Sequence, residues 1–372
     1  MLRRVKRRLA TSYADLKQVF FPQPCFPITL VSDGADWALD RVAQDILRGL
    51  EVIHPGMATI SSSISHHRNS TVHFMSRNLW NGRGGGLHPS NRAVVFSLHG
   101  QPDDSPGLAE EISSFVGSLR RISLVATCNE TLRLRLLQWG IPKDKLAIIP
   151  HAVDCSLLRP CDNKHRQTIR QELGIPHDSF CIGSFQKDGE GWEAGMVPKL
   201  VKGPDLFLAT IENVAKRVPL FVLLTGPARG YVKAGLDRIG VPYRHVMVER
   251  YEDIVPCHQA IDLYLVSSRD EGGPLASLEA LACATPVVST PVGMLKDLIR
   301  NNFDGVIAES FDPLELSGIV IALYEAPEER KRIGNRGRDL ALTIDLVPVA
   351  RQWWEKVYAP QLMALGRLDT IR

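Results

Sequence analysis

Residues 263–282 have the sequence LYLVSSRDEGGPLASLEALA, which predicts a buried strand, a glycine loop and a helix in direct succession. Leu263–Val266 is wholly apolar, as a strand covered on both faces of a parallel sheet should be. Gly272 and Gly273 mark the loop, and Pro274 fits the first turn of a helix, where its missing N–H costs nothing. We therefore expect a parallel α/β sheet here.

The same loop has the properties of an anion site. Adjacent glycines let backbone N–H groups approach a ligand, and a helix N-terminus carries about half a positive charge. Glu271 lies in the loop at the carboxyl edge of the strand, and Glu279 lies in the helix, roughly 8 Å along its axis from Pro274. These carboxylates could accept hydrogen bonds from hydroxyls at the two ends of a sugar nucleotide. The alternative is that Glu271 is only a charge partner of the helix and Glu279 a solvated helix residue.

Apolar runs separated by amphipathic stretches extend this pattern in both directions, which predicts helices on both faces of parallel sheets. The further strand candidates are Ile28–Ser32, Thr71–Met75, Ala93–Leu98, Leu124–Cys128, Leu146–Pro150, Phe180–Ser184, Leu220–Thr225, His245–Val248, Val287–Thr290 and Gly305–Ala308. The clearest helical stretches are Ser113–Leu119, Asn129–Trp139 and Gly203–Arg217. Asp154–His165 is the least periodic stretch, and we expect it to link two α/β halves.

This pattern predicts four parts in the chain. They are a basic helix at 1–24, a Rossmann-like domain at 25–155, a second at 166–345 and a helix at 346–372. The aromatic residues of the last helix need burial. They could find it across the interface between the domains or on a single domain.

Composition excludes several classes of protein. With 372 residues, 44% hydrophobic and 23% charged, the chain is not disordered, collagenous or a disulfide scaffold. A net charge of +3 does not indicate nucleic-acid binding. No apolar run is long enough to span a bilayer, and no signal-peptide core follows the basic start. Seven cysteines without a C-x-x-C spacing indicate reduced thiols, so we expect a cytoplasmic protein.

Residues 2–21 place basic and apolar side chains at roughly helical spacing. Such a helix can lie on an anionic bilayer, which would bring the protein to the inner face of the membrane. The alternative is a solvated helix packed on the fold.

The two glutamates, together with the segment ATPVVSTPVG at 284–293, resemble the signature of glycosyltransferase family 4, and the order of elements is similar over residues 25–350. The resemblance implies the GT-B fold, in which two Rossmann-like domains face each other across a cleft. It also implies that Glu271 contacts the donor sugar and Glu279 the ribose. Backbone amides that hold sugar and phosphate correspond to Gly272, Gly273 and Leu275. The family's glycine–aromatic–glycine is replaced here by Gly272-Gly273-Pro274.

Two cations that neutralise the diphosphate of the donor are also implied, because a leaving diphosphate gains charge in the transition state. Lys202, followed by glycine, matches the family's lysine. The family's arginine position is Ser184, so Lys187 is the expected substitute, and a glycine-rich insertion, Asp188–Val201, separates the two lysines. Arg229 is a weaker candidate for a phosphate contact, with a surface arginine as the alternative.

In the N-terminal half, His99 ends a strand where the family has a histidine near the reacting sugar and the acceptor. Without the resemblance, a lone histidine is more often structural. Gly34 follows the first strand and partly matches a glycine loop that faces the donor phosphates.

The resemblance predicts a retaining, metal-independent glycosyltransferase of the hexosyltransferase type, such as polysaccharide biosynthesis uses. A nucleotide-diphosphate sugar would be its co-substrate, with no cofactor, and the acceptor would be a glycan, a lipid-linked molecule or a small molecule. The catalytic residues would be His99, Glu271 and Lys202. Neither a P-loop nor an Asp-x-Asp motif occurs. Two other interpretations remain open: a GT-B nucleotide-sugar epimerase, and a glycan-binding protein without activity.

Overall fold

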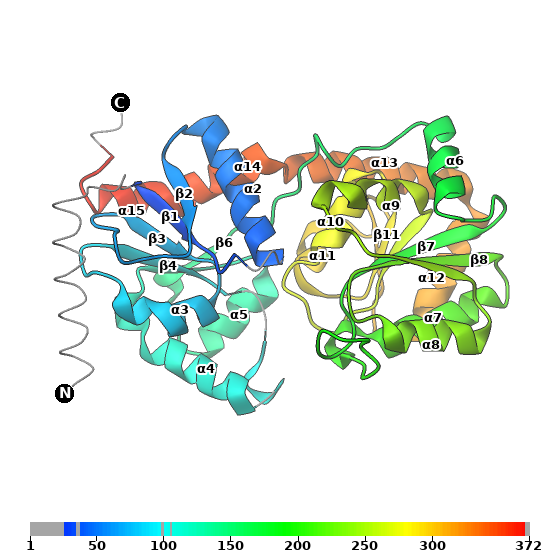
Figure 1. Cartoon of the computed structure of the whole chain (residues 1–372), viewed down its shortest axis with the longest axis horizontal. Coiled ribbons are helices and arrows are strands. Elements are labelled where there is room, and N and C mark those ends of the chain that lie inside the picture. Colours follow the sequence, from blue (N-terminus) through cyan, green and yellow to red (C-terminus); the bar gives the residue numbers. More distant parts are fainter. Residues whose placement is uncertain (1–25, 35–37, 98–99, 105, 369–372) are drawn as a thin grey trace. The chain divides into compact units, whose positions relative to one another are not determined.

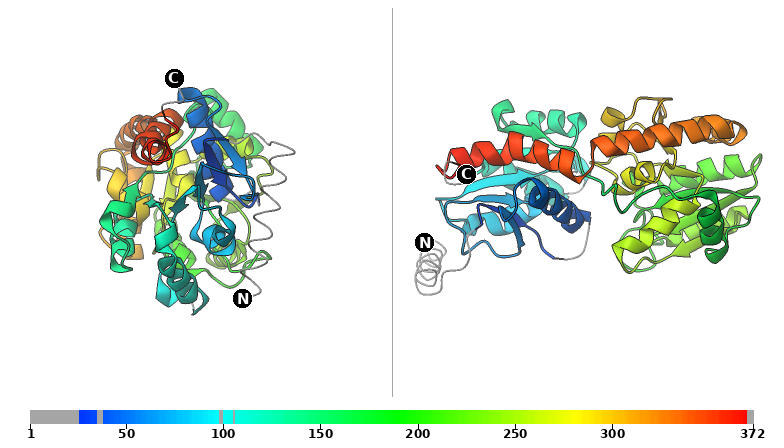
Figure 2. Two further views of the ribbon diagram at one scale, coloured as in Figure 1. Left: turned by 90° about the vertical axis from the view of Figure 1, so that its left-hand side faces the viewer. Right: turned by 90° about the horizontal axis from the view of Figure 1, so that it is seen from above.

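The computed structural model describes residues 26–34, 38–97, 100–104 and 106–368. It divides the chain into two compact units (Figure 1). The first contains the described chain up to Ala152 and resumes at Leu346, and the second is Val153–Asp345. Each unit is a parallel sheet with helices on both faces, which Figure 2 shows from two further directions.

The sheet of the second unit has six parallel strands in the order β12-β11-β10-β7-β8-β9. Its strands are β7 (Phe180–Phe185), β8 (Leu220–Thr225), β9 (Tyr243–Val246), β10 (Leu263–Val266), β11 (Val287–Ser289) and β12 (Val306–Ile307). Its helices are α6 (Asn163–Glu172), α7 (Pro204–Ala215), α8 (Gly230–Ile239), α9 (Ile254–Ala260), α10 (Leu275–Ala282), α11 (Gly293–Leu298), α12 (Pro313–Glu325) and α13 (Pro327–Thr343). Helices α7, α8 and α12 lie on one side of the sheet, and α9, α10 and α13 lie on the other (Figure 1).

The first unit has the strand order β2-β1-β3-β4-β5-β6. Its strands are β1 (Ile28–Val31), β2 (Ala58–Ser61), β3 (Thr71–Phe74), β4 (Arg92–Phe96), β5 (Leu124–Thr127) and β6 (Leu146–Ile148). Its helices are α2 (Ala38–Ile53), α3 (Arg77–Arg83), α4 (Pro106–Gly117), α5 (Glu130–Gln138), α14 (Leu346–Trp353) and α15 (Ala359–Met363), with a π-helical turn at Trp354–Tyr358 between the last two.

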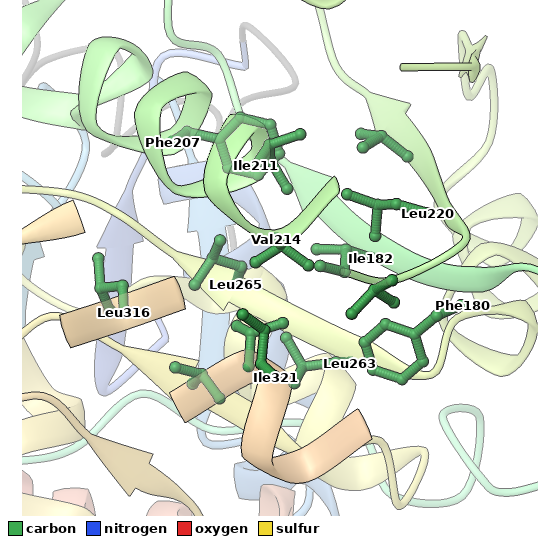
Figure 3. Close-up of a cluster of buried hydrophobic side chains, with 14 of the residues drawn as sticks. Phe180, Ile182, Phe207, Ile211, Val214, Leu220, Leu263, Leu265, Leu316 and Ile321 are labelled. Atoms are coloured by element: carbon green, nitrogen blue, oxygen red, sulfur yellow. The ribbon is translucent and has the colours of Figure 1, made fainter. Parts of the chain in front are cut away.

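A core between the sheet and its helices holds the second unit together (Figure 3). Phe207, Ile211 and Val214 of α7 pack with Leu316 and Ile321 of α12 over the apolar face of the strands. Each such side chain, fully buried, contributes about 1.5–3 kcal/mol. This core makes the sheet a rigid base for the loops at its edge.

The final helices pack on the first unit. Gly49 of α2 has no room for a side chain, because a Cβ there would lie 2.4 Å from the carbonyl oxygen of Leu346. The buried Trp353 and Tyr358 complete this unit's core, where the Tyr358 hydroxyl lies 2.9 Å from His73 Nδ1. The aromatic residues of the C-terminal stretch therefore find their burial against α2 and β3.

All eleven strands expected from the sequence are present, with ends shifted by a few residues. One strand, β2, was not predicted, because it is an edge strand with only Ala58 fully buried and so lacks an apolar pattern. The linker expected at 154–165 was partly wrong: α6 begins at Asn163, with Asp162 as its N-cap. Within the described ranges, no helix is both long enough and apolar enough to cross a bilayer. The basic segment 2–21 lies outside them.

Candidate active site

The residues singled out in the second unit gather at the carboxyl edge of its sheet. Strands β7 and β10 are neighbours there, and the chain continues from β7 to β8 on the opposite side. This reversal of strand order is the place where open α/β sheets bind ligands. Two loops meet at it, 186–203 after β7 and 267–274 after β10.

Backbone contacts hold these two loops together. The N–H of Arg269 donates to the carbonyl of Val201 at 2.8 Å, and the guanidinium of Arg269 forms a bidentate pair with Asp205. Gly203 has φ +61°, and a Cβ at this position would lie 1.9 Å from the carbonyl oxygen of Ser267. Only glycine allows the loops to approach this closely.

This approach brings Lys202 to Glu271. Lys202 Nζ lies 2.6 Å from Glu271 Oε1, which also accepts a hydrogen bond from the hydroxyl of Ser268 at 2.9 Å. The side chain of Glu271 is 9% exposed and that of Lys202 is 27% exposed. The pair is thus a carboxylate and an ammonium held together at the sheet edge, with the lysine more open to solvent.

A second contact fixes the backbone of the glycine loop. The N–H of Met294, at the start of α11, donates to the carbonyl of Gly272 at 2.8 Å. Gly293 has φ +54°, and a Cβ there would lie 2.6 Å from the same carbonyl oxygen. The carbonyl of Gly272 thus points toward α11. Gly272 and Gly273 lie directly before Pro274, the N-cap of α10, and Leu275 is the first residue of this helix. Pro274 provides no side-chain hydrogen bond to the start of α10.

Glu279 is buried on α10, with both carboxylate oxygens engaged. Oε1 accepts the hydroxyl of Tyr251 at 2.8 Å, and Oε2 lies 3.0 Å from Nε2 of the fully buried His258. The alternative of a solvated Glu279 is wrong, since this residue is 8% exposed. Sequence analysis missed Tyr251 and His258, which lie 28 and 21 residues before the glutamate and form no motif with it.

The two other cationic candidates have different surroundings. The ammonium of Lys187 lies 3.6 Å from the centre of the Trp192 ring. Arg229 is 1% exposed and pairs with the buried carboxylate of Asp188 at 3.0 Å, so the alternative of a surface arginine is wrong. Its guanidinium also donates to the carbonyl and the hydroxyl of Ser184. The partners named here for Arg229, Asp188 and Ser184, are both protein groups. A contact between Arg229 and a phosphate remains a prediction.

Two of the predicted site residues, Gly34 and His99, belong to the first unit. Gly34 has φ +72°, and among the described residues no atom outside its chain neighbours would lie within 4 Å of a Cβ added there. His99 lies outside the described residues. No group of three or more His, Cys, Asp or Glu side chains that could hold a metal ion occurs in the described part of either unit.

The chain is similar to a known protein family and to several known proteins. Residues 184–340 match the family model described as glycosyl transferases group 1. The D-inositol 3-phosphate glycosyltransferase of Xylanimonas cellulosilytica is 30% identical over 226 residues, which cover 58% of this chain and 52% of that protein. Its namesake from Corynebacterium aurimucosum is 26% identical over 284 residues, 72% of this chain and 64% of that protein. The chain spans about half the length of the first of these relatives.

Solved structures extend the similarity over most of the chain. HepE of Anabaena in complex with UDP superposes with a TM-score of 0.71 at 17% identity, covering 89% of this chain and 99% of HepE. Sucrose-phosphate synthase of Thermosynechococcus elongatus gives a TM-score of 0.65 at 16% identity, covering 89% of this chain and 80% of that one. At such identities the likeness concerns the fold, and the GT-B fold expected from the sequence is confirmed.

Proposed function

Because residues 184–340 match the family model of the group 1 glycosyl transferases, we propose that the chain moves a sugar from a nucleotide-diphosphate sugar to an acceptor hydroxyl. The observation that carries the proposal is the pairing of Lys202 with Glu271 at the point where the strand order reverses. Glu279 follows on the same loop and helix. A diphosphate between a sugar and a ribose fits this arrangement, in which the ammonium of Lys202 pairs with the carboxylate of Glu271 and Glu279 lies further along, on α10.

Each side chain has a role in this proposal. Glu271 accepts hydrogen bonds from hydroxyls of the donor sugar, and Glu279 accepts them from hydroxyls of the ribose. Lys202 and Lys187 bind the diphosphate and stabilise the charge that it gains as it leaves. The amides of Gly272, Gly273 and Leu275 contribute backbone donors at the start of α10.

From the first unit, His99 is the proposed contact near the reacting sugar and the acceptor, and Gly34 is a proposed contact of the donor phosphates. HepE has been solved with UDP and with UDP-glucose, which supports a nucleotide sugar as the donor. The relatives named above act on D-inositol 3-phosphate, so a phosphorylated polyol joins glycans and lipid-linked molecules as an acceptor to test.

The test is incubation of the full chain with UDP-, GDP-, ADP- and dTDP-sugars, with and without these acceptors. Sugar transfer, or slow hydrolysis without an acceptor, supports the proposal. A free, epimerised nucleotide sugar would identify an epimerase instead. No reaction, combined with binding of a glycan, would identify a protein without activity.

The proposed retention of the anomeric configuration can be tested once a transfer product has been obtained. NMR of the new glycosidic bond should show the anomeric configuration of the donor. An inverted product would contradict retention and leave the transfer reaction itself in place.

Membrane contact through residues 2–21 stays a separate prediction. Flotation with anionic liposomes at low salt tests it. The full chain should float and be released by salt, whereas a chain that starts at Pro22 should not. If both stay in solution, the membrane prediction is wrong.

A further inference from the structure

The insertion at 188–201 forms a hairpin whose two ends meet. Gly189 and Pro198 form an antiparallel bridge, and the N–H of Lys199 donates to the carbonyl of Asp188 at 2.8 Å. Lys187 is the residue directly before Asp188, which this pairing places opposite Lys199. The chain reaches Lys202 one short helical turn later.

The hairpin is firmly attached to the loop after β8. A Cβ on Gly195 would lie 2.2 Å from the carbonyl oxygen of Ala228, so the two backbones are in direct contact. The base of the hairpin is also held by the buried pair of Asp188 and Arg229. The backbone of the hairpin is thus fixed to the rest of the unit, and this fixes the positions from which its side chains extend.

This packing removes one anion site from the sheet edge. The N–H groups of Gly230 and Tyr231, at the start of α8, donate to the carbonyls of Ala194 and Gly195 at 2.7 and 3.0 Å. A helix N-terminus binds phosphate through such N–H groups. Because the hairpin occupies them, a phosphate at this edge must find its positive charge elsewhere.

The arginine position at the end of β7 does not supply that charge either. Ser184 stands there, and its hydroxyl accepts from the buried Arg229. Side chains of the hairpin and the turn after it remain as sources of cations.

Lys199 lies one turn before Lys202: the N–H of Lys202 donates to the carbonyl of Lys199 at 2.8 Å, in a 3₁₀ turn, where residues three apart share a face. Burial lowers the pKa of Lys199, the ammonium of Lys202 lowers it further and that of Lys187 adds to the effect, whereas the Glu190 and Glu271 carboxylates oppose the change. Ammonium groups repel one another, and a bound diphosphate would reduce this repulsion, as the Glu190 and Glu271 carboxylates already do in part. The Trp192 ring restrains one of them by its contact with Lys187.

We propose that the 188–201 hairpin supplies Lys199 as a third diphosphate-binding cation beside Lys187 and Lys202, replacing the arginine that is absent at Ser184. The inference rests on the proposed function and adds a residue that acts on the diphosphate and not on the nucleoside. The expected ligand is the diphosphate of a nucleotide or nucleotide sugar.

Calorimetric titration of the full chain with UDP, GDP and ADP, and with the matching free nucleosides, tests this role. Lys199→Met should weaken binding of the preferred diphosphate by about tenfold or more, as loss of a charged hydrogen bond does, and leave the nucleoside unaffected. Lys199→Arg should keep most of the affinity. Lys216→Met is the matched control, since it removes the same charge from an exposed site after α7, at the opposite edge of the sheet.

The outcomes separate this inference from the function on which it rests. If Lys199→Met binds the diphosphate like the wild type while Lys202→Met does not, the inference is wrong and the proposed function stands. If the wild type binds none of the three diphosphates, both are wrong. Lys199→Gln, compared in the same way and checked by its melting temperature, gives the answer if the Met variant does not fold.

Discussion

The charged residues of the site are held by partners from several elements. Among the partners of Glu279, the hydroxyl of Tyr251 donates to Oε1, and Nε2 of His258 lies 3.0 Å from Oε2. A carboxylate offers about four lone-pair positions, so it can keep protein partners and also accept a hydrogen bond from a ligand. The side chain is thus oriented before a ligand arrives, which reduces the entropy cost of binding.

The glutamates should therefore differ in what their loss does. Glu279→Ala should weaken nucleotide binding by roughly 1.5–3 kcal/mol, as loss of charged hydrogen bonds does. Glu271→Ala should mainly reduce turnover, because its partner Lys202 lies at the proposed leaving group. Calorimetry and initial rates measure the two effects, with Glu328→Ala on α13 as an exposed control. If both variants bind and turn over like the wild type, the site has been misplaced.

Two buried histidines predict acid sensitivity of the first unit. Burial lowers the pKa of His73 to about 3 and that of His151 to about 4, below the usual 6.5. The unfolded chain then binds protons that the folded one does not, so stability should fall as the pH drops from about 6.5 toward 4. At pH 5 the loss should be about 2 kcal/mol for each histidine.

Denaturant unfolding followed by tryptophan fluorescence at pH 7 and pH 5 measures this loss. His151→Phe should reduce it, and the exposed His177→Phe should not. An equal loss in all three proteins would show that the buried histidines do not cause it.

Among the elements, the loops after β7 and β10 depend on one close approach. Gly203 lets the turn that carries Lys202 lie against Ser267, and so sets the distance from Lys202 to Glu271. The 188–201 hairpin is a longer addition to the same loop, and it closes onto α8. The geometry of the site is thus determined by backbone contacts between loops.

Gly203→Ala should therefore separate these loops. A Cβ 1.9 Å from the Ser267 carbonyl, at φ +61°, must displace backbone, so we expect a loss of roughly 1–3 kcal/mol in stability and weaker nucleotide binding. Gly240→Ala is a matched control with φ +70° and no atom within 4 Å of the added Cβ. Melting temperatures and calorimetry should show a larger effect for Gly203→Ala. Equal effects would mean that the backbone angle alone matters.

At the scale of the whole molecule, the chain forms one continuous and one discontinuous unit. Val153 and Asp345 pair in a parallel bridge, so the second unit closes on its own ends. The first unit is completed only when the chain returns at Leu346. The residues proposed to bind the nucleotide, apart from Gly34, all lie in the second unit.

Residues 153–345 expressed alone should consequently fold and bind the preferred nucleoside diphosphate with nearly the affinity of the full chain. Residues 26–152 alone should not fold, because Trp353 and Tyr358 are missing from their core. Circular dichroism and calorimetry check both statements. A folded second unit that does not bind would show that the first unit contributes essential contacts.

Sugar transfer should also proceed in the presence of EDTA. The lysines at the sheet edge supply the positive charge that the departing diphosphate requires. Initial rates with and without the chelator measure this. Loss of activity with EDTA that manganese restores would contradict the prediction.

The sequence by itself determined the parallel α/β architecture and the strand–loop–helix that carries Glu271 and Glu279. These features depend on local patterns: apolar runs, helical spacing and glycine or proline at the ends of elements. The edge strand β2 escaped prediction because partial burial leaves no such pattern.

Only the tertiary structure decided which side chains become partners. Lys202 and Glu271 are 69 residues apart in the chain, and His258 reaches Glu279 from a different helix. Arg229 became a buried ion pair because the hairpin placed Asp188 beside it, and the last helices joined the first unit because α2 accommodates them at Gly49. Burial and pairing of this kind depend on contacts between distant segments, which no local spacing encodes.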